Sequence, residues 1–394
     1  MALFAGAATA PLSIPDWPQS TDGTSLQARV LVLDDGATRL AVVSLTALCL
    51  VKRHADQVRR AVSEAAHVPF EDVLCACTHV HSGPPVFAGE PEVREGMMAR
   101  IVAAAAAAAR GARLQPARFG YSSEPLAGVS RVRRILRRDG SAITLRRAWP
   151  QYWNWATDPE TVGPEEPLDD LLTVMRVDNA GGEPLAAIIH FTCHPIPDFL
   201  GYAADLIERA LGVPCLILNG CSGSVDTPFE VPMRGKTQAD QLPILGQALG
   251  HRALSDFART ETAGEATLGV SSREVFLPAV QEFLDNPGEK RSIWPEALRD
   301  GGFHTLVQCL RVGDLALVGI PGEAHVGFAA RIEEISPFGL TRPVGLANDE
   351  VGYLFPAEAR ARGGYEPDPQ YWGVVDAEGL EVVAKAAKAG LAEI

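Results

Sequence analysis

The chain has 394 residues, of which 47% are hydrophobic and 21% are charged, the ordinary composition of a soluble globular protein. This length leaves room for one large core or for two lobes. The net charge of −14 argues against nucleic-acid binding and against anionic membranes, because both attract basic patches. The sequence contains no apolar run of roughly 18 residues, so we expect no stable membrane insertion.

Cysteine usage and the N-terminal segment predict where the protein resides. The seven cysteines are an odd number, and most lie in apolar, strand-like runs. Such cysteines are typical of buried, reduced thiols in the cytoplasm rather than of a disulfide framework. Residues 1–6 lack the basic region and the long apolar region of a secretory signal. We therefore expect a cytoplasmic protein.

Strand and helix patterns alternate along the first half of the chain. Apolar runs at 28–33 and 41–45 flank Asp-Asp-Gly and predict a hairpin. The following pattern predicts a helix over about 51–66, a strand at 73–77 and an alanine-rich helix over about 91–110. Four further elements are expected: a hairpin of 172–177 with 186–191, a helix over about 202–211 and a buried strand at 214–218.

The second half repeats this alternation. Residues 305–312 and 315–320 predict a hairpin, followed by a helix to about 335 and a strand near 344–347. Segments 131–166 and 278–302 are rich in Arg, Trp, Pro and Gly, and we expect long loops there, which are often functional. With no internal repeat or low-complexity linker, the simplest fold class is α/β, as one large mixed-sheet domain over residues 1–394.

The most informative segment is Cys-Thr-His-Val-His-Ser-Gly-Pro at 77–84, where a predicted buried strand becomes a loop. In an extended segment residues i and i+2 point to the same side, so we expect His79 and His81 to present their imidazoles together. Imidazole is the commonest protein ligand for a metal such as zinc. A hydrogen-bonded pair with only a structural role is the alternative, and the motif alone does not decide between the two.

Four predicted strand or hairpin ends carry side chains that can bind a metal: His79, His194, Glu323 and Tyr353. Strand ends that meet at one sheet edge commonly form sites in α/β proteins. Two imidazoles and one carboxylate would make a catalytic zinc site with an open position for water, whose pKa the metal lowers to about 7. The spacing is not a local zinc motif, so Glu323 as a first-turn helix carboxylate and His194 as a core histidine stay open.

These motifs resemble, in the same order, those of the neutral (non-lysosomal) ceramidases and their shorter bacterial relatives. Residues 78–84 are similar to the family's Thr-His-x-His-Ser-x-Pro signature, and 321–323 to its Pro-Gly-Glu motif. Gly352-Tyr353 and Tyr365-Glu366 resemble its paired tyrosine segment. Phe-Thr-Cys-His-Pro at 191–195 lies where the family has its second zinc histidine.

The resemblance covers about residues 5–370 and implies the ceramidase catalytic fold, with no room for the immunoglobulin-like C-terminal domain of the long ceramidases. It implies Zn²⁺ held by four side chains: His79, His194, Glu323 and Tyr353. It also implies that His81 lies near the metal-bound water or a polar group of the substrate, that Arg131 contacts the substrate, and that Tyr365 donates to the developing oxyanion. For Arg131, a place in a basic run on a solvated face is the alternative.

Two departures from the family pattern concern the substrate more than the metal. The family's Gly-Asp-Val-Ser-Pro loop is represented by Gly-Ser-Val-Asp-Thr-Pro at 223–228, so Asp226 takes the place of the serine. Asp226 could orient a ligand or act as a base. Thr46 stands where relatives commonly have Asp.

We therefore expect a zinc-dependent hydrolase that cleaves an amide (N-acyl) bond of a small soluble substrate with metal-activated water, with His81 or Asp226 moving the proton. Ceramide itself is not the expected substrate, because the chain lacks a membrane-docking segment. The alternatives are a metal-dependent esterase, lactonase or cyclic-amide hydrolase, and a non-catalytic small-molecule binder. A serine hydrolase is rejected, because the second glycine of 220–224 is misplaced for a nucleophile elbow. Whether the chain forms a homo-oligomer stays open.

Overall fold

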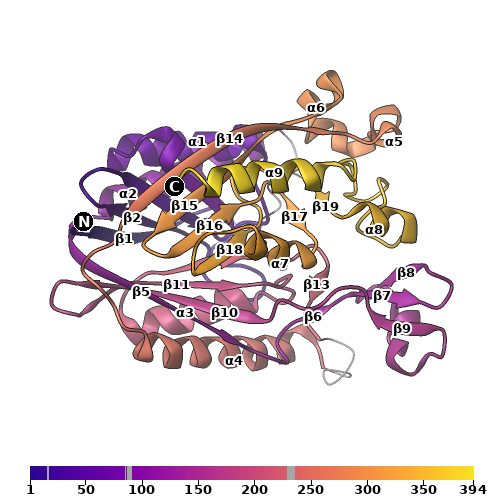
Figure 1. Cartoon of the computed structure of the whole chain (residues 1–394), viewed down its shortest axis with the longest axis horizontal. Helices are drawn as coiled ribbons and strands as arrows, with labels where there is room; N and C mark the ends of the chain where they lie inside the picture. Colours follow the sequence, from indigo (N-terminus) through magenta and orange to yellow (C-terminus); the bar gives the residue numbers. More distant parts are fainter. Residues whose placement is uncertain (16, 85, 87–90, 229–235) are drawn as a thin grey trace.

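The computed structural model describes residues 1–15, 17–84, 86, 91–228 and 236–394. Its centre consists of two β-sheets packed face to face (Figure 1). The larger sheet has eight strands in the order β12-β11-β10-β5-β1-β2-β3-β4. These strands are β1 (Phe4–Pro11), β2 (Gln27–Asp34), β3 (Arg39–Leu45), β4 (Val73–Cys77), β5 (Gln115–Pro125), β10 (Leu171–Asn179), β11 (Pro184–Phe191) and β12 (Cys215–Asn219).

The smaller sheet has four strands in the order β14-β15-β16-β18. They are β14 (Leu268–Pro278), β15 (Gly302–Val312), β16 (Leu315–Gly319) and β18 (Leu340–Val344). Within these two sheets, neighbouring strands are antiparallel except for three parallel pairs: β3 with β4, β11 with β12, and β16 with β18. Each of these parallel pairs is connected by a segment that contains a helix, which is the usual requirement for parallel strands.

Alternating side chains of the large sheet serve two different cores. Leu31 and Leu33 of β2 face the space between the sheets, whereas Val30 and Val32 pack toward α1 (Lys52–Ala66) and α2 (Pro91–Gly111). Because both faces are buried, these strands read as continuous apolar runs instead of alternating ones. The result is a four-layer arrangement of helices, sheet, sheet and helices.

The outer helices each bury one apolar face. Helices α3 (Phe199–Leu211) and α4 (Gln238–Arg259) cover β10 and β11, and α7 (Gly327–Glu334) and α9 (Gly379–Leu391) cover the smaller sheet. Asp198 caps α3 by accepting a hydrogen bond from the N–H of Gly201 at 3.0 Å, and Thr237 and Asp240 form a capping box at α4. The short helices α5 (Gln281–Asp285), α6 (Pro295–Asp300) and α8 (Ala357–Arg362) lie at the periphery (Figure 1).

Three small sheets gather at the end of the molecule away from the N-terminus (Figure 1). They are β6 (Arg131–Val132) with β13 (Val225–Asp226), β17 (Glu323–Ala324) with β19 (Tyr353–Leu354), and a three-stranded sheet in the order β8-β7-β9. The strands of the last are β7 (Arg134–Arg137), β8 (Ala142–Thr144) and β9 (Thr161–Pro164). We call it the distal sheet. This end of the fold carries the candidate site.

The structure confirms the α/β fold class and most predicted elements, and it corrects several others. The strand expected near 344–347 lies at 340–344, and the predicted loop over 131–166 contains the distal sheet. The predicted loop over 278–302 contains α5 and α6. The patterns of β1, β5, β14, α4 and α9 led to no prediction. The distal sheet was missed because arginine occupies β7, so the segment lacks apolar alternation.

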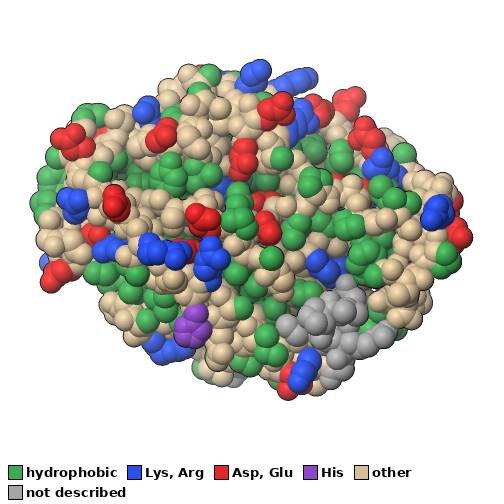
Figure 2. Space-filling view, turned by 60° about the horizontal axis from the view of Figure 1, so that its bottom comes forward, with side chains coloured by type: hydrophobic (Ala, Val, Ile, Leu, Met, Phe, Trp, Pro, Cys, Tyr) green, Lys and Arg blue, Asp and Glu red, His purple; other side chains and the backbone are tan. Residues whose placement is uncertain are grey.

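In the part of the chain that the structure describes, no helix has the length and apolar character needed to cross a bilayer. On the face shown in Figure 2, acidic and basic side chains are interspersed with apolar ones, rather than gathered into one large patch of a single sign.

Candidate metal centre

The four candidate ligands come from four separate strand ends. His79 follows β4, His194 follows β11, and Glu323 and Tyr353 begin the short strands β17 and β19. Strands β17 and β19 are parallel, with Glu323 directly opposite Tyr353 in register, so both side chains start from the same side of the ladder. All four residues are buried, with exposed fractions between 2% and 7%. The structure therefore brings ends that are distant in sequence to one edge.

His79 and His81 meet for a reason other than the one predicted. β4 ends at Cys77, and His79 has a φ of +68°, so the segment is not extended and the two-residue repeat of a strand does not apply. The imidazoles nevertheless lie edge to face with centroids 4.6 Å apart, and their Nε2 atoms are 3.2 Å apart. The left-handed backbone conformation is energetically unfavourable for a residue other than glycine, and such strain is found preferentially at functional sites.

The hydrogen bonds of two histidines fix which ring nitrogen carries the proton. Nδ1 of His79 lies 3.1 Å from the carbonyl oxygen of Leu48. Nδ1 of His194 lies 2.7 Å from the carbonyl oxygen of Ser222 and 2.9 Å from that of Val225. A carbonyl oxygen can only accept, so Nδ1 must donate in both rings. In the neutral tautomer each Nε2 then presents a lone pair.

Those two lone pairs point at a carboxylate. Oε2 of Glu323 lies 3.2 Å from Nε2 of His79 and 3.0 Å from Nε2 of His194. Burial and the nearby guanidinium of Arg133 lower the pKa of His194, which favours its neutral form. Glu323 Oε2 is buried and receives no hydrogen bond from the described residues. With both imidazoles in the neutral form, three acceptor atoms converge, an arrangement that a bound cation would satisfy.

The spacing of these atoms fits a tetrahedral zinc ion. With zinc–ligand distances of about 2.0–2.2 Å, tetrahedral ligands lie roughly 3.3 Å from one another. The two separations between Glu323 and the histidines are 3.2 and 3.0 Å. The ligand atoms of His79, His81 and His194 also lie within 4.8 Å of one another, so His81 belongs to the same cluster. Imidazole nitrogens with a carboxylate oxygen are the donor set that zinc prefers.

Tyr353 is held beside this cluster by an arginine that the sequence motifs did not single out. Nη2 of Arg133 donates to the hydroxyl oxygen of Tyr353 at 3.0 Å and to the carbonyl oxygen of Gly223 at 2.7 Å. Burial raises the pKa of the Tyr353 hydroxyl well above its usual value, and the charge of Glu323 raises it further. Arg133 is buried, and Nε donates to Glu366 at 2.8 Å. Because Arg133 and Tyr353 are 220 positions apart in the chain, no local sequence pattern indicated their contact.

The other predicted residues lie around the cluster. Arg131 and Asp226 are directly opposite each other in the β6–β13 ladder, and Asp226 Oδ1 accepts a hydrogen bond from the N–H of Thr227 at 2.7 Å. The ring of Tyr365 lies 5.9 Å from the ring of Tyr353. His81 is exposed to solvent, although burial of its surroundings and the neighbouring His79 lower its pKa. The structure assembles these residues at one place, but it does not assign their roles.

A second buried carboxylic acid, Glu350, also escaped sequence analysis. It is 2% exposed, and burial and the charge of Glu323 raise its pKa well above the usual value. Its Oε1 accepts a hydrogen bond from the N–H of Gly352 at 2.6 Å. The raised pKa favours the neutral form of this carboxyl group beside the charge of Glu323.

A second set of metal-ligand types has different surroundings. Glu165, Glu166 and His325 have ligand atoms within 4.8 Å of one another. However, His325 Nδ1 lies 2.8 Å from Oε1 of Glu166, and Glu165 forms ion pairs with Arg134 and Arg362. Protons and guanidinium groups therefore already neutralise these carboxylates.

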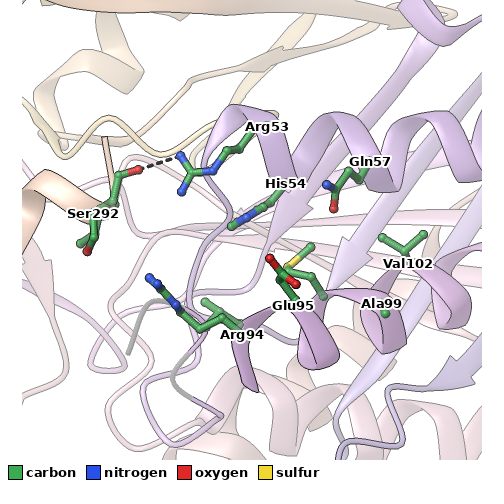
Figure 3. Close-up of a pocket in the computed structure, with 11 residues that line it drawn as sticks. Arg53, His54, Gln57, Arg94, Glu95, Ala99, Val102 and Ser292 are labelled. Atoms are coloured by element: carbon green, nitrogen blue, oxygen red, sulfur yellow. Dashed lines mark hydrogen bonds between the residues drawn. The ribbon is translucent and has the colours of Figure 1, made fainter. Parts of the chain in front are cut away.

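A cavity of about 440 Å³ lies elsewhere, between α1 and α2 (Figure 3). Its lining includes Arg53, His54 and Arg94, and none of the clustered histidines. Burial, followed by the charges of Arg53 and Arg94, lowers the pKa of His54 to about 4. This cavity has a single histidine and lacks the convergence of acceptor atoms that marks the cluster.

Comparison with known proteins supports the fold. No protein-family model and no curated protein matches the chain. Among solved structures, the neutral ceramidase from Pseudomonas aeruginosa matches with a TM-score of 0.75 and 18% identity, over 99% of this chain and 74% of that one. A structure described as ceramidase complexed with C2 matches with a TM-score of 0.71 and 19% identity, over 100% and 75% of the two chains. The chain therefore has the neutral ceramidase fold.

Proposed function

We propose that this protein is a zinc-dependent hydrolase that cleaves an amide (N-acyl) bond of a small soluble substrate. One observation carries the proposal: Nε2 atoms of His79 and His194 converge on Oε2 of Glu323 at 3.2 and 3.0 Å, where the neutral imidazoles present lone pairs. The name of the structural neighbours, ceramidase, denotes cleavage of an amide and supports this bond type.

His79, His194 and Glu323 would hold the ion, with Tyr353 as the fourth ligand. When bound, zinc polarises a carbonyl and makes water nucleophilic at neutral pH. The carbonyl oxygens of Leu48, Ser222 and Val225 fix the orientation of the two imidazoles through their Nδ1–H groups. Such outer hydrogen bonds typically change metal affinity or activity 10- to 100-fold when they are removed.

The remaining residues handle protons and charge. His81 is exposed to solvent, with Nε2 3.2 Å from that of His79, so it can accept a proton from water at the centre and release it. Asp226 is the second candidate for this transfer. Tyr365 would donate its hydroxyl to the oxyanion, and Arg131 would contact the substrate.

We also propose a cytoplasmic location and a single catalytic domain over residues 1–394. All seven cysteines are buried and none forms a disulfide, which agrees with a reducing compartment.

The test combines metal analysis with a panel of N-acyl compounds and matched esters. We expect about one zinc per chain, release of amine from the amides, and loss of both zinc and activity in H194A. H54A is the matched control, because His54 lies in the separate cavity, and it should keep zinc and activity. If the protein carries zinc but cleaves only esters or lactones, the bond cleaved is an ester and the proposed amide cleavage is wrong. Folded protein that takes up no zinc would overturn the proposal.

A further inference from the structure

Arg146 is an arginine beside the candidate centre that the metal chemistry does not use. It follows β8 of the distal sheet, and its guanidinium carbon lies 3.6 Å from the ring centroid of Tyr365. The ring of Tyr365 is in turn 5.9 Å from that of Tyr353. Arg146 therefore stacks on the residue next to the candidate fourth ligand.

The backbone around Arg146 is fixed on both sides. The N–H of Leu145 donates to the carbonyl oxygen of Arg133 at 2.7 Å. Thr144 Oγ1 donates to Glu366 at 2.8 Å and accepts from the N–H of Tyr365 at 3.0 Å. These bonds attach the distal sheet to the segment that carries Tyr365, so Arg146 is held in place before any ligand binds.

The charge of Arg146 is not matched by an acid. Among the described residues, no carboxylate pairs with its guanidinium and no hydrogen-bond acceptor contacts it. By contrast, Arg133 and Arg134 both donate to Glu366. The planar guanidinium fork matches a carboxylate, with which it forms paired hydrogen bonds.

Aromatic rings surround this guanidinium. The centroid of Trp149 lies 6.0 Å from that of Tyr365, and Tyr371 lies 4.4 Å from Tyr365. Arg146 also lies 5.4 Å from the ring of Trp149. Tyr371 is 38% exposed, so the edge of the aromatic group is open to solvent. The site thus offers flat apolar surface and one cation side by side.

We propose that Arg146 binds the carboxylate of the substrate, which places the substrate in the class of N-acyl amino acids. The inference rests on the proposed amide hydrolysis and narrows it. It distinguishes this chain from an enzyme for a neutral lipid amide, because the cation would have no partner on such a substrate.

The test compares N-acetylphenylalanine with its neutral carboxamide, which differs only in the charged group. R146Q keeps hydrogen-bond donors but loses the charge. It should lower kcat/KM for the carboxylate about 10- to 100-fold, mainly through KM, and change it less than about twofold for the carboxamide. R146K should restore part of the loss. Arg138 lies in the turn after β7, and its Nε donates to the carbonyl oxygen of Pro159. R138Q should leave kcat/KM for both substrates unchanged.

Calorimetric binding of N-acetylphenylalanine to wild type and R146Q tests the inference without turnover. Weaker binding to R146Q supports it, and equal binding overturns it. Equal loss of kcat/KM for both substrates would also overturn it, because Arg146 would then support the fold and not the carboxylate. If wild type hydrolyses both substrates with equal kcat/KM, the inference about the carboxylate is wrong, whereas the proposed amide hydrolysis is still supported. Absence of any amide hydrolysis by zinc-loaded wild type would instead refute the proposed function.

Discussion

Two groups of histidine and carboxylate side chains in this fold differ in what neutralises them. At the cluster of His79, His194 and Glu323, both Nδ1–H groups are used by backbone carbonyls, and the carboxylate oxygen faces lone pairs. At the second group, His325 donates its Nδ1–H to Glu166, and a backbone N–H at Gly327 donates to the same carboxylate.

The difference shows that residue type alone does not define a metal site. Both groups offer imidazole and carboxylate atoms within a few ångströms, but in the second the carboxylates are paired with arginines and with the Nδ1–H of His325. The decisive feature is the partner of the second ring nitrogen, which determines whether Nε2 or Nδ1 faces the carboxylate. The comparison predicts that zinc binds the first group and not the second.

The largest expected effect comes from removing a ligand of the first group. H79A, H194A and E323Q should each lower zinc content from about one per chain to near zero, and activity should fall by at least about a thousandfold. Metal analysis and turnover on the same preparations measure both quantities, with circular dichroism to show that each variant is folded. Full zinc in H79A and E323Q together would show that the ligand set is wrong.

The ion pairs of Arg134, which include one with Glu165 of the second group, should stabilise the folded protein. Arg134 donates to Glu366 at 2.8 Å and pairs with Glu165, and both carboxylates are buried. R134M would leave two buried charges short of a partner, and we expect a loss of about 3–5 kcal/mol in the free energy of unfolding. Urea unfolding measures it. R299M, which removes an exposed pair with Asp300, is the control and should change little.

A pH dependence follows from the same ion pairs. Burial opposes the charge of Glu366, but Arg133 and Arg134 outweigh it and lower its pKa from 4.5 to about 2. The folded pKa lies below the unfolded one, so this stabilisation is complete above about pH 4.5 and is lost as the pH falls toward 2. The amount is about 3 kcal/mol. The measurement compares H194A with the double variant H194A/E366Q, so that metal loss does not contribute. Plots of the unfolding free energy against pH between pH 3 and 7 should have different slopes for the two proteins. Parallel curves would contradict the prediction.

The smallest effect is expected at the second group itself. In the wild type Oε1 of Glu166 accepts from His325 and Oε2 accepts from Gly327, so the single oxygen of E166Q keeps one of these two hydrogen bonds. Zinc content should remain near one per chain, and stability should fall by about 1–3 kcal/mol because one donor loses its acceptor. Metal analysis beside H194A gives the contrast. If E166Q loses as much zinc as H194A does, the prediction that zinc binds only the first group is wrong.

Six of the eight strands of the large sheet could be predicted, and so could the candidate ligands, because these features leave local signals. Buried strands such as β3 and β11 are continuous apolar runs, and His79 and His194 follow such runs directly. Order along the chain and resemblance to a known family added Glu323 and Tyr353. The roles of these residues stay predictions.

Other features could not be predicted, because they depend on contacts between distant segments. Arg133 reaches Tyr353 across 220 positions, and β7 has arginine where an apolar alternation would mark a strand. The left-handed backbone of His79 is set by bonds from Thr78 and His79 to the segment at 45–47. None of these interactions has a signature in neighbouring residues.

The distal sheet has a consequence for how such an enzyme can diversify. The candidate ligands come from β4, β11, β17 and β19, whereas Arg146 and Trp149 follow β8. None of the four candidate ligands belongs to the distal sheet, which Arg134 attaches to Glu366. If the proposed function and the proposed role of Arg146 hold, exchanging the outer residues of the distal sheet would change the preferred substrate without changing the candidate ligands. Bond cleavage and substrate choice would then depend on separate parts of the chain.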